Sequence, residues 1–215
     1  MAGAKMEGNC YICGKTLGKT AMKNHIMKEH LAKGDEECML LKIEGAHAKG
    51  YWLFVDIAKD KSLGDLDAFL REIWLECCGH LSRFSVGGYY GEISKKEKLG
   101  NIGVGVKILH EYDFGTTTEC LITFIGETLR PRQKKAVRVL GRNAPPQDTC
   151  ASCGKPAEYL CLECLYDDTE PCYCEECAEE HEHEDLLTLT NSPRCGCCGY
   201  EGELDGYTFN PAKFK

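Results

Sequence analysis

The chain has 215 residues, of which 43% are hydrophobic and 9% aromatic, and its formal net charge is −8 at pH 7. This length and composition allow one core of moderate size plus small satellite modules. No apolar run approaches the roughly 18 residues of a membrane-spanning helix, so we expect no membrane partner and a cytoplasmic location. The chain has 16 cysteines and shows no secretory signal, which favours metal binding over disulfides.

The first predicted element is a zinc finger and its linker, within residues 1–37. Cys10 and Cys13 form a C-x2-C pair, and eleven residues separate it from His25 and His30. This spacing resembles a divergent Cys2His2 finger, one residue shorter than usual between the pairs. We therefore predict that these four side chains bind one Zn²⁺.

A helix of the finger is predicted to begin at Thr20, whose hydroxyl can cap it, and to carry both histidines. Leu17 and Met22 take the two apolar positions of a small core. The lysines of the finger outnumber its one acid, Glu29, which is compatible with phosphate contact. The alternative is a solvated helix face on a finger that binds protein or no partner. The lysines in question are Lys15, Lys19, Lys23, Lys28 and Lys33.

Residues 38–129 predict an α+β core, with one main helix on one face of a mostly antiparallel sheet. The helix is expected between a Ser62 cap and a stop at Gly79, because its apolar residues fall at helical spacing. Alternating apolar residues indicate strands over residues 39–43, 51–57, 81–86, 104–112 and 120–124.

Three motifs of this core are distinctive: Gly79-His80-Leu81-Ser82-Arg83-Phe84, the Gly-Gly-x-Tyr-Gly turn at 87–91, and Tyr112-Asp113-Phe114-Gly115. Together with the strands and the helix, they resemble the Ri-plasmid pRiA4b open-reading-frame-three family, prokaryotic proteins associated with mobile elements. Ser82 and Thr116 stand where the resemblance would place a second His and an Asp. Any polar site that the resemblance implies is therefore reduced to His80 and Asp113.

His80 and Asp113 have two interpretations. They could act as a general base and its orienting carboxylate. However, no nucleophile lies at a sequence spacing typical of a catalytic site, which favours a structural hydrogen bond. The nearby Cys77 and Cys78 are interpreted as small buried apolar residues, like Cys38 and Cys120, rather than as a redox pair. We therefore expect no catalytic residue in the core.

Residues 130–147 are predicted to be a basic linker, with a net charge of +6 and no acid. Pro145-Pro146 marks a domain boundary. The segment is either a solvated connector or an edge strand blunted by positive charge. Alternatively, it is a phosphate-contacting arm that acts with the finger through Arg132, Lys134, Lys135 and Arg138.

Residues 148–215 are predicted to be a zinc module followed by an acidic tail. C-x2-C pairs recur at intervals and a His pair closes the series. Each C-x2-C pair puts two thiolates on one tight turn, so four pairs can hold two Zn²⁺. The pairs are Cys150/Cys153, Cys161/Cys164, Cys174/Cys177 and His181/His183.

This order of ligands resembles a B-box zinc finger and, more loosely, a MYND-type finger. The resemblance implies a cross-brace, in which the first and third pairs bind one zinc and the second and fourth pairs bind the other. Four cysteines are then spare, and Cys195 or Cys198 could replace one histidine. The spare residues are Cys172, Cys195, Cys197 and Cys198.

The net charge of −12 over residues 148–215 repels phosphate backbones, so this module is not expected to read nucleic acid. We predict a zinc-binding, non-catalytic scaffold or regulatory adaptor that holds three Zn²⁺ and binds a protein partner. One alternative is a nucleic-acid-binding protein associated with mobile elements, which would use the finger and the basic linker. The other is an enzyme with a degenerate His/Asp site in the core.

Overall fold

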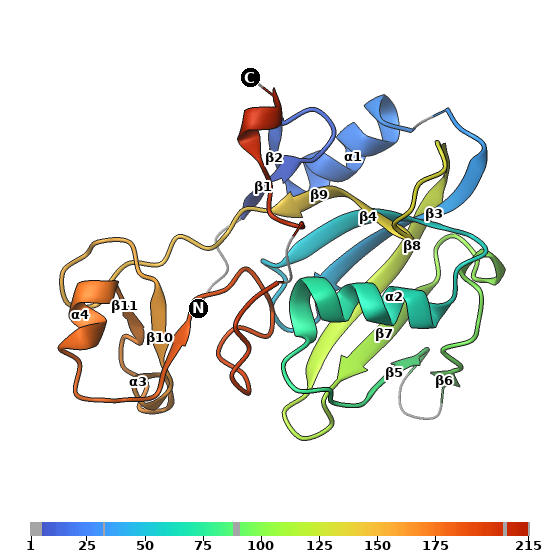
Figure 1. Ribbon diagram of the computed structural model, residues 1–215. Coiled ribbons are helices and arrows are strands. Elements are labelled where there is room, and N and C mark those ends of the chain that lie inside the picture. Colours follow the sequence, from blue (N-terminus) through green and yellow to red (C-terminus); the bar gives the residue numbers. More distant parts are fainter. Residues whose placement is uncertain (1–5, 32, 88–90, 204–205, 215) are drawn as a thin grey trace.

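A computed structural model describes residues 6–31, 33–87, 91–203 and 206–214. Nine strands form one sheet in the order β2-β1-β9-β4-β3-β8-β7-β5-β6, and each neighbouring pair is antiparallel (Figure 1). The predicted α+β class is confirmed. The strands are β1 (Glu7–Cys10), β2 (Thr16–Gly18), β3 (Glu36–Gly45), β4 (Trp52–Ala58), β5 (Ser82–Ser85), β6 (Glu92–Ile93), β7 (Lys107–Tyr112), β8 (Thr118–Arg130) and β9 (Val137–Asn143).

The helices and a second, smaller sheet complete the fold. The two longest helices are α1 (Lys19–Glu29) and α2 (Leu63–Leu70), and a π-helical turn, η1 (Arg71–Leu75), continues α2. The small sheet, in the order β11-β10-β12, belongs to the C-terminal module. The remaining elements are η2 (Leu99–Asn101), β10 (Tyr159–Cys161), α3 (Leu162–Tyr166), β11 (Cys172–Tyr173), α4 (Glu175–Glu179), β12 (Leu186–Thr188) and η3 (Pro211–Phe214).

Both faces of the central strands are buried, although the sequence predicted a helix on one face only. On one face, Leu41 and Val55 pack in a cluster with the apolar side chains of α2. On the other face, Leu40 and Phe54 pack with Met22 of α1. The zinc finger therefore covers the second face of the sheet, which explains why every residue of β4 is buried.

Helix α2 begins as predicted and ends earlier than predicted. Ser62 and Asp65 form a reciprocal capping box. The helical turns end at Leu75, where Glu76 adopts an extended conformation, and Gly79 lies in a loop with φ +78°. Residues 76–80 therefore form a loop rather than the last helical turn.

The finger is continuous with the main sheet through β1, which pairs with β9. A Cβ atom on Gly8 would lie 2.1 Å from the Arg142 carbonyl oxygen and 2.6 Å from the Trp52 ring, so only glycine allows this close approach. Gly18, the last residue of β2, is the N-cap of α1, and no side chain caps the helix there. The predicted Thr20 cap is wrong, because the chain passes directly from strand to helix.

Part of the predicted basic linker is an interior strand. Residues 137–143 form β9 between β1 and β4. The carboxylate of Asp56, on β4, is fully buried and binds two of the cations of this segment. Its Oδ1 atom accepts from Arg130 Nη1 at 2.6 Å, and its Oδ2 atom accepts from Arg138 Nη2 at 2.5 Å.

Cys38 and Cys120 are buried, as expected. Of the Gly-Gly-x-Tyr-Gly turn, Gly88 and Tyr90 lie outside the described residues. In the part of the chain that the structure describes, no helix combines the length and apolar character needed to span a bilayer.

Candidate metal centres

The four predicted finger residues meet at one point, with their ligand atoms within 4.8 Å of one another. His25 Nε2 lies 3.2 Å from Cys13 Sγ and 3.0 Å from His30 Nε2. A tetrahedral zinc with Zn–S near ~2.3 Å and Zn–N near ~2.0 Å has ligand–ligand separations of about 3.3–3.8 Å. The finger is therefore close to the size that one zinc ion requires.

A carboxylate orients one of these histidines. Glu29, one helical turn after His25, places Oε2 3.2 Å from His25 Nδ1, which leaves Nε2 facing the other ligands. Metal-binding histidines are commonly held in this way through their second ring nitrogen. Lys15 Nζ lies 3.2 Å from the same Glu29 oxygen, so this lysine contributes to the finger itself.

The C-terminal module brings its ligands together in two interleaved sets. The sets are Cys150, Cys153, Cys174 and Cys177, and Cys161, Cys164, His181 and His183. In the first, Cys153 Sγ and Cys174 Sγ are 3.6 Å apart. In the second, Cys164 Sγ lies 3.3 Å from His181 Nε2 and 3.4 Å from His183 Nδ1. This is the arrangement that the B-box resemblance implied, and Cys172 belongs to neither set.

Two of these thiols, Cys150 and Cys164, have a lowered pKa. Burial opposes ionisation of Cys150, but hydrogen bonds from the backbone of Cys174, Cys153 and Ser152 lower its pKa to about 6. Burial likewise opposes ionisation of Cys164, and the Tyr173 hydroxyl leads the contacts that lower its pKa to about 6. Because the thiolate is the form that binds metal, both residues are suited to coordination at neutral pH.

The module has little apolar material to hold it together without metal. Its buried cluster consists of four of these cysteines together with Tyr173 and Ala178, against which Tyr159, Cys177 and Leu186 pack. Modules of this size are stable when a metal replaces the missing core. The donor sets therefore fit structural zinc.

The structure also brings together a fourth set of ligands, which the sequence did not predict. Cys77, Cys78, His80 and Cys198 place their ligand atoms within 4.8 Å of one another. The prediction that both Cys77 and Cys78 are buried is wrong for Cys78, which is exposed because the helix ends before it, whereas Cys77 is half-buried and packs against the main core cluster. The short spacing Cys-Cys-x-His was the available signal, but its partner, Cys198, is 120 residues away.

His80 and Asp113 do lie side by side, with His80 Nε2 3.5 Å from Asp113 Oδ2. The same carboxylate oxygen accepts a hydrogen bond of 2.7 Å from Arg194 Nη2. The Arg194 guanidinium holds the pKa of Asp113 below its ordinary value. Asp113 is therefore engaged by a buried cation, which supports the structural interpretation of the pair over a general-base role.

A buried polar network that the sequence did not indicate lies beside α2. Asp67 Oδ1 accepts from Ser82 Oγ at 2.7 Å and lies 2.7 Å from His110 Nε2, while Lys95 Nζ donates to Oδ2 at 2.9 Å. Burial alone would raise the pKa of Asp67, but His110, Ser82 and Lys95 together hold it well below the ordinary value. Because both carboxylate oxygens of Asp67 are engaged by other side chains, we interpret Asp67 as a structural residue that holds α2 to the neighbouring segments.

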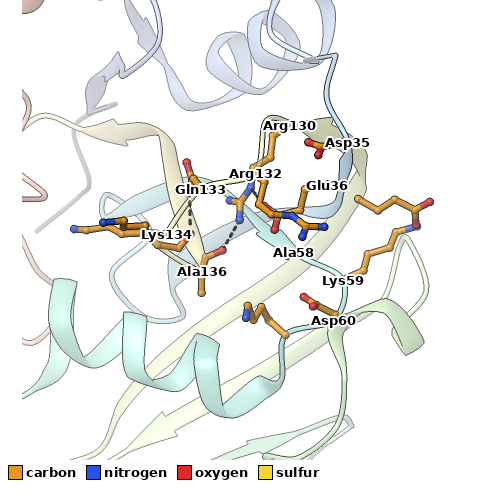
Figure 2. Close-up of a pocket in the computed structure, with 13 residues that line it drawn as sticks. Asp35, Glu36, Ala58, Lys59, Asp60, Arg130, Arg132, Gln133, Lys134 and Ala136 are labelled. Atoms are coloured by element: carbon orange, nitrogen blue, oxygen red, sulfur yellow. Dashed lines mark hydrogen bonds and ion pairs between the residues drawn. The ribbon is translucent and has the colours of Figure 1, made fainter.

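The cations of residues 130–135 line a cavity of about 450 Å³ at the ends of β3 and β4 (Figure 2). Acidic side chains share the lining, and Arg130 Nε donates to Glu36 Oε2 at 2.7 Å. A phosphate group in this cavity would therefore meet charges of both signs. The charged residues of the lining are Asp35, Glu36, Glu37, Lys59, Asp60, Lys61, Arg130, Arg132, Lys134 and Lys135.

No family model matches the chain, and no curated protein matches it. One similar solved structure is a protein of unknown function, MM3350 from Methanosarcina mazei Go1. It is 18% identical, with a TM-score of 0.44, and the match covers 58% of this chain and 78% of that one.

Proposed function

We propose that this protein is a zinc-dependent scaffold or regulatory adaptor that has no catalysis of its own and binds a protein partner. The proposal rests on one observation: each of the three predicted sets already supplies four Cys or His ligands around one point. Catalytic zinc needs an open position for water or substrate, and four protein ligands close the coordination sphere. Metal in these sets would therefore hold structure.

A surface of the C-terminal module is suited to a partner. Tyr166 and Leu165, at the end of α3, are 80% and 41% exposed. The next residues are Asp167 and Asp168, and the whole segment from residue 148 has a net charge of −12. An exposed aromatic anchor with an acidic surround fits a partner that offers an apolar pocket and a basic rim. The B-box resemblance supports the same role, and the resemblance of the core to the pRiA4b family remains a proposal.

Single substitutions test the three sets. Cys10→Ser, Cys150→Ser and Cys161→Ser are each expected to lower the zinc content by about one ion per chain, because a four-ligand site loses affinity when one thiolate is removed. Elemental analysis of protein purified without added metal makes the measurement. Cys172→Ser is the matched control and should keep the full content, since Cys172 stands outside the sets.

The result also tests the proposed cross-brace. Loss of zinc from Cys172→Ser would show that the ligands of the module have been assigned wrongly. Full zinc content in Cys150→Ser would show that its set does not bind the metal, and the proposed function would fall with it.

The nucleic-acid alternative requires cations that are free to contact phosphate. Several cations that it requires are engaged within the fold: Lys19 pairs with Glu44, and Arg138 with Asp56. Among the described residues, six of the cations named for this role have no acidic partner within 4.0 Å: Lys23, Lys28, Lys33, Arg132, Lys134 and Lys135.

We nevertheless expect no measurable binding to duplex DNA at ~0.15 M salt, because the net charge of −12 over residues 148–215 repels the phosphates that these six cations would contact. Fluorescence anisotropy over a range of salt concentrations tests this expectation. A slope near −5 that flattens by about three units in an Arg132→Ala, Lys134→Ala, Lys135→Ala triple variant would favour the alternative. Arg138 is left unchanged in this variant because it binds the buried Asp56.

A further inference from the structure

The fourth ligand set joins two distant parts of the chain. Cys77, Cys78 and His80 lie in the loop after η1, and Cys198 comes from the segment that follows the zinc module. Cys78 Sγ lies 3.7 Å from Cys198 Sγ, 3.9 Å from Cys77 Sγ and 2.9 Å from His80 Nε2. His80 Nε2 lies 3.4 Å from Cys198 Sγ.

These distances fit a metal site better than a disulfide. Two thiolates on a tetrahedral zinc are about 3.8 Å apart, and both sulfur–sulfur separations are close to that value. A disulfide requires about 2.05 Å, and all the cysteines are free. A set of three thiols and one imidazole has the ligand softness that zinc selects.

The loops that carry these ligands are shaped to converge. Gly79 has φ +78°, which lets Cys78 and His80 turn toward the same point. Cys198 itself has φ +50°, a conformation that is uncommon for a non-glycine residue and that clusters at functional sites. The backbone strain at Cys198 thus lies at the point where the two segments meet.

A second layer of contacts surrounds the set. Arg194 is fully buried, and its Nη2 atom lies 3.4 Å from Cys77 Sγ and 2.7 Å from Asp113 Oδ2. Zinc with three thiolates and one neutral imidazole has a net charge of −1, which a neighbouring guanidinium offsets. Hydrogen bonds to ligating sulfurs are the kind of outer contact that supports a metal centre.

The segment that carries Cys198 is docked on the core by direct contacts. Ser192 Oγ donates to the Trp74 carbonyl oxygen at 2.6 Å, and the Tyr200 hydroxyl donates to the Ile73 carbonyl oxygen at 3.4 Å. Both acceptors belong to η1, immediately before the ligand loop. In Figure 1 this segment, in red, lies beside the end of the α2–η1 helix that faces the module.

We propose that Cys77, Cys78, His80 and Cys198 form a fourth zinc site, which fastens residues 190–203 to the core. The site goes beyond the proposed function, because it uses none of the ligands of the finger or the module. By fastening the chain after the module, it would fix the second attachment of the module to the core, in addition to the attachment through residues 144–149.

Zinc counting in three variants tests the proposal. Cys78→Ser and Cys198→Ser are each expected to lower the zinc content from about four ions to about three, with the finger and module unaffected. Cys197→Ser is the matched control, because Cys197 is adjacent to a ligand but outside the set; it should keep about four. Equal zinc content in Cys198→Ser, Cys197→Ser and the unchanged chain would overturn the proposal.

Two further measurements guard against a variant that misfolds. In the unchanged chain, zinc should protect the exposed Cys78 and Cys198 from alkylation, and hydrogen exchange in residues 190–203 should rise in Cys198→Ser but not in Cys197→Ser. Rapid alkylation of both thiols in zinc-loaded protein, or an intact mass showing a Cys78–Cys198 disulfide, would overturn the proposal. Failure at this site alone would leave the losses in Cys10→Ser, Cys150→Ser and Cys161→Ser intact, so the proposed function is tested separately.

Discussion

Removal of zinc is expected to unfold residues 148–188 while the central strands of the main sheet stay folded. The module buries few apolar side chains besides its own ligands, and structural zinc contributes about 10–16 kcal/mol in comparably small modules. The strands β3, β4 and β8 instead belong to a metal-independent cluster packed under α2. Hydrogen exchange with and without a chelator should show loss of protection in β10, β11 and β12, and retention in β3 and β8.

Loss of zinc from the finger should destabilise the main sheet without unfolding it. The finger helix α1 covers Leu40, Trp52 and Phe54 on the second face of the sheet, so loss of its zinc uncovers apolar surface of the core. We therefore expect the sheet to survive chelation with reduced stability. Retained protection in β10–β12, in protein shown by elemental analysis to be metal-free, would contradict the proposed role of zinc in the module.

Asp56→Ala is expected to destabilise the core by about 3–5 kcal/mol, because it removes the fully buried carboxylate that pairs with both Arg130 and Arg138. The side chains of Asp56 and Arg130 are nearly inaccessible to solvent, and Arg130 is held further by Glu36 and the Ala136 carbonyl oxygen. Since a domain of this kind is stable by only about 5–15 kcal/mol in total, the change should be large. Urea denaturation of zinc-loaded protein, followed by the fluorescence of the buried tryptophans, makes the measurement.

Two controls separate this effect from a general loss of charge. Asp60→Ala alters an exposed acid four residues away and should change the stability by no more than about 0.5 kcal/mol. The double variant Asp56→Leu, Arg130→Met removes the two most deeply buried charges and leaves only the partly exposed Glu36 and Arg138 without a partner. It should recover much of the loss, because a buried ion pair can be replaced by apolar side chains of similar volume. A double variant as unstable as Asp56→Ala would mean that the packing at this position, rather than the unpaired charge, sets the stability.

The alternating apolar residues of β3 and β4 predicted the strands but not the packing on both of their faces. The pattern predicted both strands, because a period of two in apolar residues is a local property of the chain. It did not predict that Trp52 and Phe54 pack against the finger, since apolar residues on the second face do not identify what covers them. The ion pairs of the basic segment were likewise not predictable from the sequence. Its cations are close together in the chain, but Asp56 and Glu203, the acids that bind Arg138 and Arg142, come from other parts of the chain.

The sequence by itself determined the α+β class, the Ser62 cap of α2, and the ligand pairs of the finger and the module; which pairs share a metal in the module was implied by the B-box resemblance. The cap and the ligand pairs depend on short-range spacing, because a C-x2-C pair places two thiols on one turn whatever the rest of the chain does. Only the tertiary structure decided that the finger forms the second cover of the sheet and that Cys198 meets Cys78 and His80. That meeting depends on where η1 ends and on how Ser192, Arg194 and Tyr200 dock on the core. Contacts across 120 residues leave no periodic or spacing signal, because they are set by packing rather than by the local chain.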